Sequence, residues 1–205
     1  MAHRAGLEQA YDDGVRTVVD LRNPAEVQRR ETDPLVAEAV GSGMSVVPAP
    51  TEEPGDPRFT ALCGPYLNDP VHYADNVRLF PQKIGGIFHA IAAGASSFVL
   101  IPCTAGRDRS GMIAAMVQDL AGHTDEDIAA GYARAARGIN ERHRIHDPPH
   151  AREQHLSEDE LAPLLELRGQ AVVACVRELD STAFLLEHGL SSAELTALLT
   201  LTAGR

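Results

Sequence analysis

Residues 103–110 read CTAGRDRS, a cysteine and an arginine separated by five residues, between an apolar run and a helix-forming stretch. A loop that leads into a helix N-terminus exposes successive backbone N–H groups, which together with the helix dipole form a cradle for phosphate oxygens. Arg109 adds a planar guanidinium that can hold two of those oxygens at once. The same positive field favours the thiolate form of Cys103, so the segment predicts a cysteine nucleophile beside a phosphoryl group.

The remaining residues of this segment have expected tasks of their own. Gly106 lets the backbone approach a ligand closely, and the Ser110 hydroxyl can donate a hydrogen bond to the cysteine sulfur. Arg107 has two interpretations, because it either reaches a second phosphate or remains a solvated charge. The expected phosphate-binding residues are Thr104, Ala105, Gly106, Arg107, Arg109 and Ser110.

Strands and helices must hold this loop in place, and the apolar pattern predicts them in alternation. A predicted helix over 6–14 ends at a glycine, and the loop itself lies between a predicted strand and a predicted helix. The predicted strands are VRTVVDL (15–21), MSVVPAP (44–50) and FVLIP (98–102), and the helix after the loop is MIAAMVQDLAG (112–122). Asp20 and Arg22 at the end of the first strand are expected to form a structural salt bridge. The order of elements predicts an α/β fold with the loop at the carboxyl edge of a small, mostly parallel sheet.

Proline, glycine and capping residues mark the boundaries of the other helices. Residues 68–94 are predicted to be helical, with a break at Pro81 and an end at Gly94. Further helices are expected to begin at three capping-box patterns, Thr124 with Asp127, Ser157 with Glu160 and Ser191 with Glu194.

Two polar segments are predicted to be loops. Residues 51–57 contain many turn-forming residues and are expected to be an exposed loop, and 142–155 are expected to be a mobile surface loop. The latter contains His143, His146, His150 and His155, but their spacing fits no compact zinc pattern. We therefore expect neither a metal site nor a cofactor.

Composition limits the kinds of partner that the chain can have. Its 205 residues carry a formal net charge of −11, which argues against binding to duplex DNA or to an anionic membrane surface. The sequence shows neither a signal peptide nor a membrane span. The three cysteines are too few for a disulfide framework, so a reducing compartment, the cytoplasm, is expected. Cys63 and Cys175 are expected to be buried apolar residues.

The segment AGRDRSG resembles the AG(K/R)DRTG signature of a bacterial and fungal branch of the cysteine-dependent protein tyrosine phosphatase superfamily. Four further segments resemble that branch in the same order, namely GVRTVVDLRNPAEV, HYADNVRLFP, DEDIAAGYA and LLEHGLSSAEL. The resemblance implies one phosphatase-like domain over 1–205, with a small, mostly parallel sheet flanked by helices on both faces.

The resemblance also implies roles for single residues. Cys103 would attack phosphorus, Arg109 and the loop amides would hold the phosphoryl group, and Asp108 would be the general acid and base. The implied substrate is a phosphorylated protein or a phosphoinositide, and the oligomeric state stays open. Two alternatives remain, a non-catalytic phosphate-binding pseudophosphatase and another thiolate chemistry such as sulfur transfer or arsenate reduction.

The sequence departs from the family pattern in three places. Pro102 stands where the family has a histidine before the cysteine, and it has no backbone N–H to donate. Thr51 stands where relatives often place an aspartate, and Glu52 or Glu53 is the expected substitute. The chain also begins near the point where the first strand of the family ends, so the usual N-terminal segment is expected to be missing.

Overall fold

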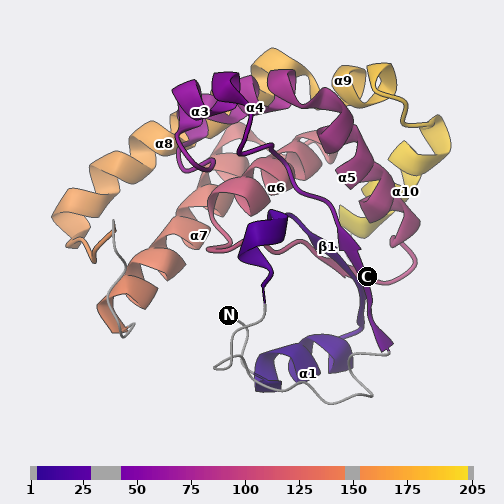
Figure 1. Ribbon diagram of the computed structural model, residues 1–205, viewed down its shortest axis with the longest axis horizontal. Coiled ribbons are helices and arrows are strands. Elements are labelled where there is room, and N and C mark those ends of the chain that lie inside the picture. The colour runs from indigo at the N-terminus through magenta and orange to yellow at the C-terminus, as the bar shows by residue number, and fades with distance from the viewer. Residues whose placement is uncertain (1–3, 29–42, 146–152, 203–205) are drawn as a thin grey trace.

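A small parallel sheet holds the N-terminal half of the molecule together (Figure 1). The computed structural model describes residues 4–28, 43–145 and 153–202. In these ranges the strands are β1 (Val15–Asp20), β2 (Ser45–Pro48) and β3 (Phe98–Leu100), in the spatial order β2-β1-β3 and all parallel. Each predicted strand is present, and the expected α/β class is confirmed.

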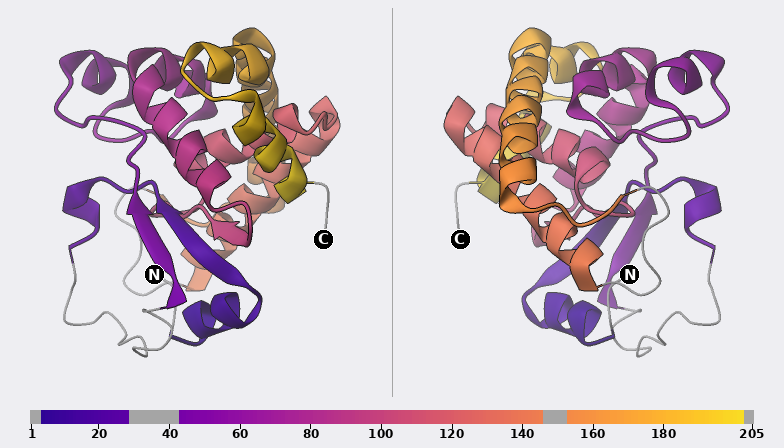
Figure 2. Two further views of the ribbon diagram at one scale, coloured as in Figure 1. Left: turned by 90° about the vertical axis from the view of Figure 1, so that its right-hand side faces the viewer. Right: turned by 90° about the vertical axis from the view of Figure 1, so that its left-hand side faces the viewer.

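The two faces of the sheet have different surroundings. Val18 pairs with Val46 on one side and with Leu100 on the other, so the three side chains share one face. Val46 is 59% exposed and Leu100 36% exposed on that face, whereas Val19 on the opposite face is fully buried. Among the described residues, Figure 2 shows the helices gathered mainly on one side of the strands.

The helices between residues 68 and 94 follow their predicted boundaries. The first helix begins and ends two residues earlier than predicted, and the helices over 24–26 and 57–63 were not predicted. Asp69 caps the short helix η2 by accepting a hydrogen bond from the Val71 N–H, and Pro81 separates α4 from α5. The α5 helix ends at Gly94, as expected. The elements of this half are α1 (Arg4–Asp12), η1 (Pro24–Glu26), α3 (Pro57–Cys63), η2 (Pro70–His72), α4 (Tyr73–Leu79) and α5 (Pro81–Ala93).

The helices after the loop form most of the helical layer. They are α6 (Asp108–Leu120), α7 (Asp125–Ile145), α8 (Glu158–Leu179), α9 (Ser181–Glu187) and α10 (Ser192–Thr202). The predicted capping boxes are present, since the backbone N–H groups of Ser157 and Ser191 donate to the glutamates three residues later. The Thr124 hydroxyl likewise accepts from the Asp127 N–H. Across the described ranges, none of these helices combines the length and apolar character needed to cross a bilayer.

The two predicted loops need correction. Residues 142–145 form the last turn of α7, because the helix extends beyond its buried apolar residues into a charged segment. Residues 146–152 lie outside the described residues. In the loop over 51–57, Thr51 and Glu52 are fully buried, because they follow β2 directly into the interior. At both places, polar side chains indicated an exposed loop, although some of these residues are helical or buried.

The core centres on α6, whose inward face carries Met112, Ile113 and Met116, all at most 1% exposed. This helix contacts α7, α8 and α9, and its first turn contains the last residues of the predicted phosphate loop, 103–110. The loop therefore depends on the packing of α6.

Replacing Ile113 by alanine is expected to lower the free energy of unfolding by about 2–5 kcal/mol, because the cavity left in this core is only partly refilled. Leu167→Ala is the matched control on α8, where the side chain is 64% exposed, and it should change stability by less than about 0.5 kcal/mol. Urea denaturation followed by circular dichroism measures both. Equal losses in the two variants would contradict the packing described here.

Candidate active site

The segment 101–107 connects β3 to α6 and curls around the sulfur of Cys103. Gly106 has a φ of +80°, in the left-handed region that glycine adopts without strain, and its N–H donates to the Cys103 Sγ at 3.1 Å. The α6 helix begins at Asp108, four residues earlier than the sequence predicted, so Asp108 and Arg109 occupy its first turn. The sulfur therefore lies on the inner side of a loop that ends at a helix N-terminus.

Two hydrogen bonds hold the start of the loop, one from the residue after β1 and one from α6. The Leu21 N–H donates to the Pro102 carbonyl at 2.9 Å, and the Ser110 hydroxyl donates to the Ile101 carbonyl at 2.8 Å. The expected donation from Ser110 to the cysteine sulfur is therefore not observed, because the hydroxyl hydrogen is used on the backbone. Pro102 anchors the loop through its carbonyl oxygen, and this contact does not need the backbone N–H that proline lacks.

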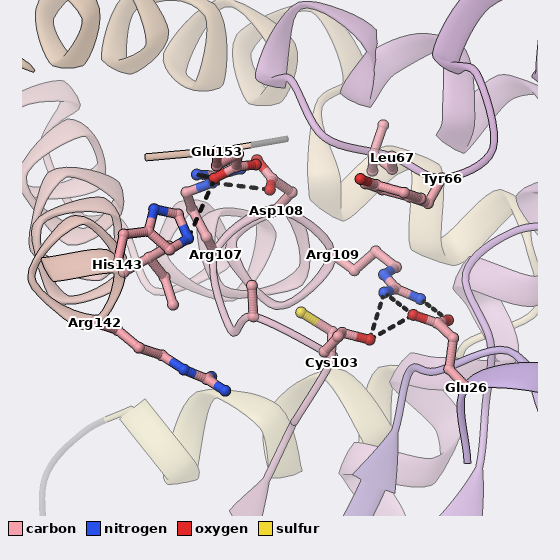
Figure 3. A pocket seen from close by; sticks show the side chains of 13 residues that line it. Glu26, Tyr66, Leu67, Cys103, Arg107, Asp108, Arg109, Arg142, His143 and Glu153 are labelled. Atoms are coloured by element: carbon pink, nitrogen blue, oxygen red, sulfur yellow. Dashed lines mark hydrogen bonds and ion pairs between the residues drawn. The ribbon is translucent and has the colours of Figure 1, made fainter. Parts of the chain in front are cut away.

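A cavity of about 240 Å³ opens above the loop and is lined by Cys103, Thr104 and Ala105 (Figure 3). Tyr66, Leu67 and Ile139 form an apolar part of its wall. The charged residues that line it are Glu26, Arg107, Asp108, Arg109, Arg142 and Glu153, together with His143. The predicted loop residues thus converge on one pocket, although Gly106 and Ser110 are not part of its lining.

Arg109 is held by a glutamate that sequence reasoning missed. Its Nη1 and Nη2 donate to the two carboxylate oxygens of Glu26 at 2.6 and 2.7 Å, and Nη2 also donates to the Thr104 hydroxyl at 3.1 Å. The guanidinium is only 4% exposed. A signal for Glu26 did exist, because Asn23 and Glu26 form a capping box just past the carboxyl end of β1, where parallel sheets place ligands.

The ionisation of Glu26 depends on this contact. Burial alone would raise the pKa of the Glu26 carboxyl, but hydrogen bonds from Arg109, Thr104 and the Asn23 backbone bring its pKa down to about 2. Glu26 is therefore a carboxylate at neutral pH, and its charge balances that of the buried Arg109.

Arg107 and Asp108 form a second charged group beside the pocket. The Arg107 Nε donates to Asp108 Oδ2 at 2.9 Å, and its two terminal nitrogens donate to Glu153 at 2.8 and 2.9 Å. Arg107 is 7% exposed, so its interpretation as a solvated charge is wrong. Burial alone would lower the pKa of Arg107, but the Glu153 and Asp108 carboxylates hold it above its ordinary value.

Asp108 combines burial with one unused oxygen. Its Oδ1 is buried and has no hydrogen-bond partner within the described chain, whereas Oδ2 accepts from Arg107. Burial raises the pKa of the Asp108 carboxyl above its ordinary value, against the opposing effect of Arg107. A carboxyl group with these properties holds a proton at higher pH than a free aspartate does.

The two glutamates considered as substitutes lie in different environments. Glu52 is fully buried, accepts from the Asn23 amide at 3.2 Å and lies 3.6 Å from Arg109 Nη1. Burial raises its pKa, although the nearby Arg109 opposes the effect. Glu53 is exposed and contacts the Lys83 ammonium at 2.6 Å. Neither residue lines the pocket, whereas Asp108 does.

Other expectations concern residues around the site. Asp20 and Arg22 form the predicted salt bridge, with 2.6 Å between Oδ2 and Nη2. Cys63 and Cys175 are buried as predicted, and burial raises the pKa of their thiols to about 11 and about 12. His143 lies 3.8 Å from Glu153 and faces the pocket, a placement that the sequence did not indicate.

The described ranges contain no group of three or more metal-ligating side chains that could hold an ion. His146 and His150, two members of the histidine run considered above, lie outside those ranges.

Glu26→Gln is expected to change how stability depends on pH. Between the ordinary carboxyl pKa of 4.5 and the value of about 2 in the folded chain, the unfolded chain binds a proton that the folded chain does not. The stability that Glu26 contributes is therefore present above this window and is lost as the pH falls through it. The melting temperatures of wild type and Glu26→Gln should differ most near pH 7 and converge near pH 2. Glu53→Gln, on an exposed side chain, is the control and should parallel wild type; a parallel curve for Glu26→Gln would contradict the assignment.

Comparison with known proteins agrees with this geometry. A protein from Nostoc commune named tyrosine-protein phosphatase is 46% identical over 50 residues, which is 24% of this chain and 17% of that relative. A model of the tyrosine phosphatase family matches residues 1–201, which include the loop, Glu26 and the elements that hold them. The chain therefore belongs to the tyrosine phosphatase family.

Proposed function

We propose that the chain hydrolyses phosphate monoesters through a cysteinyl-phosphate on Cys103. The observation that carries the proposal is the loop itself, in which the Gly106 N–H points at Sγ and Arg109 lies alongside, at the start of α6. Amide hydrogens and a guanidinium in this arrangement stabilise a thiolate and a phosphoryl group with the same positive field. Family membership supports the same reaction.

The proposed reaction has two displacements at phosphorus. In the first, the Cys103 thiolate forms an S–P bond while the bond from phosphorus to the leaving oxygen breaks, and that oxygen takes a proton from Asp108. In the second, water attacks phosphorus, Asp108 takes a proton from that water, and the S–P bond breaks to release phosphate and restore the thiolate. An alcohol or phenol and inorganic phosphate are formed from the ester and one water molecule.

Asp108 is our choice for the acid because it lines the pocket and its pKa is raised by burial. An acid works best when its pKa approaches the working pH, since it then holds a proton and still releases it readily. Glu52 shares the raised pKa but lies behind Arg109, outside the pocket lining.

Aryl phosphates, phosphotyrosine above all, are the substrates that we propose. Tyr66, Leu67 and Ile139 offer the phenyl ring an apolar wall next to the charged loop. The free thiols Cys63, Cys103 and Cys175 support a reducing compartment such as the cytoplasm, where the nucleophile stays reduced. The family match over 1–201 supports a single phosphatase-like domain.

Cys103→Ser is expected to abolish turnover of p-nitrophenyl phosphate but to retain phosphate binding, because a hydroxyl is a far poorer nucleophile than a thiolate at neutral pH. Release of p-nitrophenol measures turnover, and calorimetric titration with inorganic phosphate measures binding. Vanadate should inhibit the wild type, and Cys63→Ser is the control, since that buried thiol does not face the pocket. Retained hydrolysis in Cys103→Ser would rule out the mechanism, whereas a wild type that binds phosphate without hydrolysis would be a pseudophosphatase.

Asp108→Asn is expected to slow phosphotyrosine hydrolysis by roughly 10²–10⁴-fold, the usual contribution of a general acid. Esters with good leaving groups need little protonation and should be slowed much less. A series of aryl phosphates with leaving groups of graded acidity measures the dependence, and Glu52→Gln is the comparison variant. If Asp108→Asn slowed all esters equally, Asp108 would be a residue that orders the loop.

A further inference from the structure

Arg142 differs from the other arginines at the pocket. It projects from the last turn of α7 and lines the same cavity as Cys103. Arg107 and Arg109 each hold a glutamate through two nitrogens, whereas Arg142 has neither a hydrogen bond nor an ion pair with any part of the chain that the structure describes. An arginine is positively charged at every physiological pH, so Arg142 presents an unneutralised cation to whatever enters the pocket.

Arg142 approaches the pocket from a different side than Arg109 does. Figure 3 shows Arg142 on the opposite side of Cys103 from Arg109, extending from α7, and Arg142 is one of the residues that line the pocket. The phosphoryl group belongs at the loop, where the Gly106 N–H and Arg109 flank the sulfur. A second anion on the substrate, separate from the phosphate that is hydrolysed, would meet Arg142 on this other side of Cys103.

We propose that Arg142 binds the carboxylate of an acidic residue that neighbours the phosphotyrosine in a peptide substrate, an inference that rests on the proposed function. A guanidinium and a carboxylate match in shape and can share two hydrogen bonds. The phosphotyrosine would place its ring against Tyr66, Leu67 and Ile139 and its phosphate at the loop. A flanking residue would then meet Arg142, three residues beyond Ile139 on α7.

The distribution of charge favours a peptide over a polyphosphorylated lipid headgroup. A second phosphate is one of the two interpretations given above for Arg107, but both of its terminal nitrogens donate to Glu153 and its Nε donates to Asp108. Of the arginines that line the pocket, Arg142 alone is unpaired within the described chain, and one charge suits one carboxylate better than several phosphates. The net charge of −11 also opposes approach to an anionic membrane.

The test measures binding, so that it does not depend on turnover. In the Cys103→Ser background, fluorescence anisotropy would compare phosphotyrosine peptides whose two flanking residues are aspartate, alanine or lysine. We expect the aspartate peptide to bind about fivefold more tightly than the alanine peptide, as for a partly exposed charge pair. Arg142→Glu should reverse the order, so that the lysine peptide binds best.

Arg144→Glu is the matched control. It makes the same charge change two residues further along α7, at an exposed side chain that pairs with Glu141 and does not line the pocket. It should keep the preference for aspartate. Equal binding of the aspartate and alanine peptides, or equal effects of the two substitutions, would overturn the proposal.

Two further measurements separate the remaining outcomes. A soluble inositol polyphosphate that binds through Arg142, in the absence of any peptide preference, would overturn the peptide assignment in favour of a phosphoinositide. Wild-type turnover of p-nitrophenyl phosphate tests the proposed function alone. A wild type without turnover whose Cys103→Ser form still prefers the aspartate peptide would overturn the catalytic proposal and support the Arg142 site.

Discussion

The bidentate pair between Arg109 and Glu26 is the contact on which the rest of the site depends. Taking a guanidinium out of water is unfavourable unless carboxylates neutralise it, and Arg109 is nearly fully buried. Glu26 supplies that charge from the turn after β1, while Arg109 belongs to the first turn of α6. One contact therefore fixes the end of a strand relative to the start of a helix, and Thr104 in the loop between β3 and α6 is joined to both partners.

The same pair leaves part of Arg109 available for a ligand. Glu26 occupies the two terminal nitrogens, whereas Nε makes no hydrogen bond with the described residues and can still donate. Glu52 adds a further carboxyl 3.6 Å away, but burial raises its pKa, so this group takes up a proton more readily than an exposed glutamate. The site can thus hold its arginine firmly without accumulating the full negative charge that would repel a phosphate.

Local patterns in the sequence were enough to predict the scaffold. Pro81, Gly94 and the capping boxes at Ser157 and Ser191 act through their own neighbours, and the structure places helix ends where they indicated. The phosphate loop was also predictable, because its glycine, arginine and cysteine lie within one short segment between a strand and a helix.

The partners of that loop were not predictable in the same way. Glu26 lies 83 residues from Arg109, and Glu153 lies 46 residues from Arg107, so no spacing rule connects them. Glu52 was expected to be exposed because it is charged and adjoins turn-forming residues, but its burial is stabilised by Asn23 and Arg109 from other segments. Contacts between charged residues that are distant in the sequence therefore determine the burial and the partners of these side chains, which local patterns do not predict.

Opposing effects act on the proton affinity of Asp108, the residue that we propose both gives and takes a proton. Burial raises its pKa and favours the protonated acid, whereas the N-terminus of α6 and the Arg107 guanidinium favour the carboxylate. Apolar surroundings alone would raise the pKa of a carboxyl group so far that it releases its proton poorly. An arginine partner alone would lower the pKa so far that the group is already ionised at neutral pH. The carboxylate of Glu153, which also binds Arg107, favours the protonated form as well, so the net effect is a pKa of Asp108 above its ordinary value. Arg107 and Asp108 are adjacent residues where the Cys103 loop meets α6, so the segment that positions Cys103 also affects the proton affinity of Asp108.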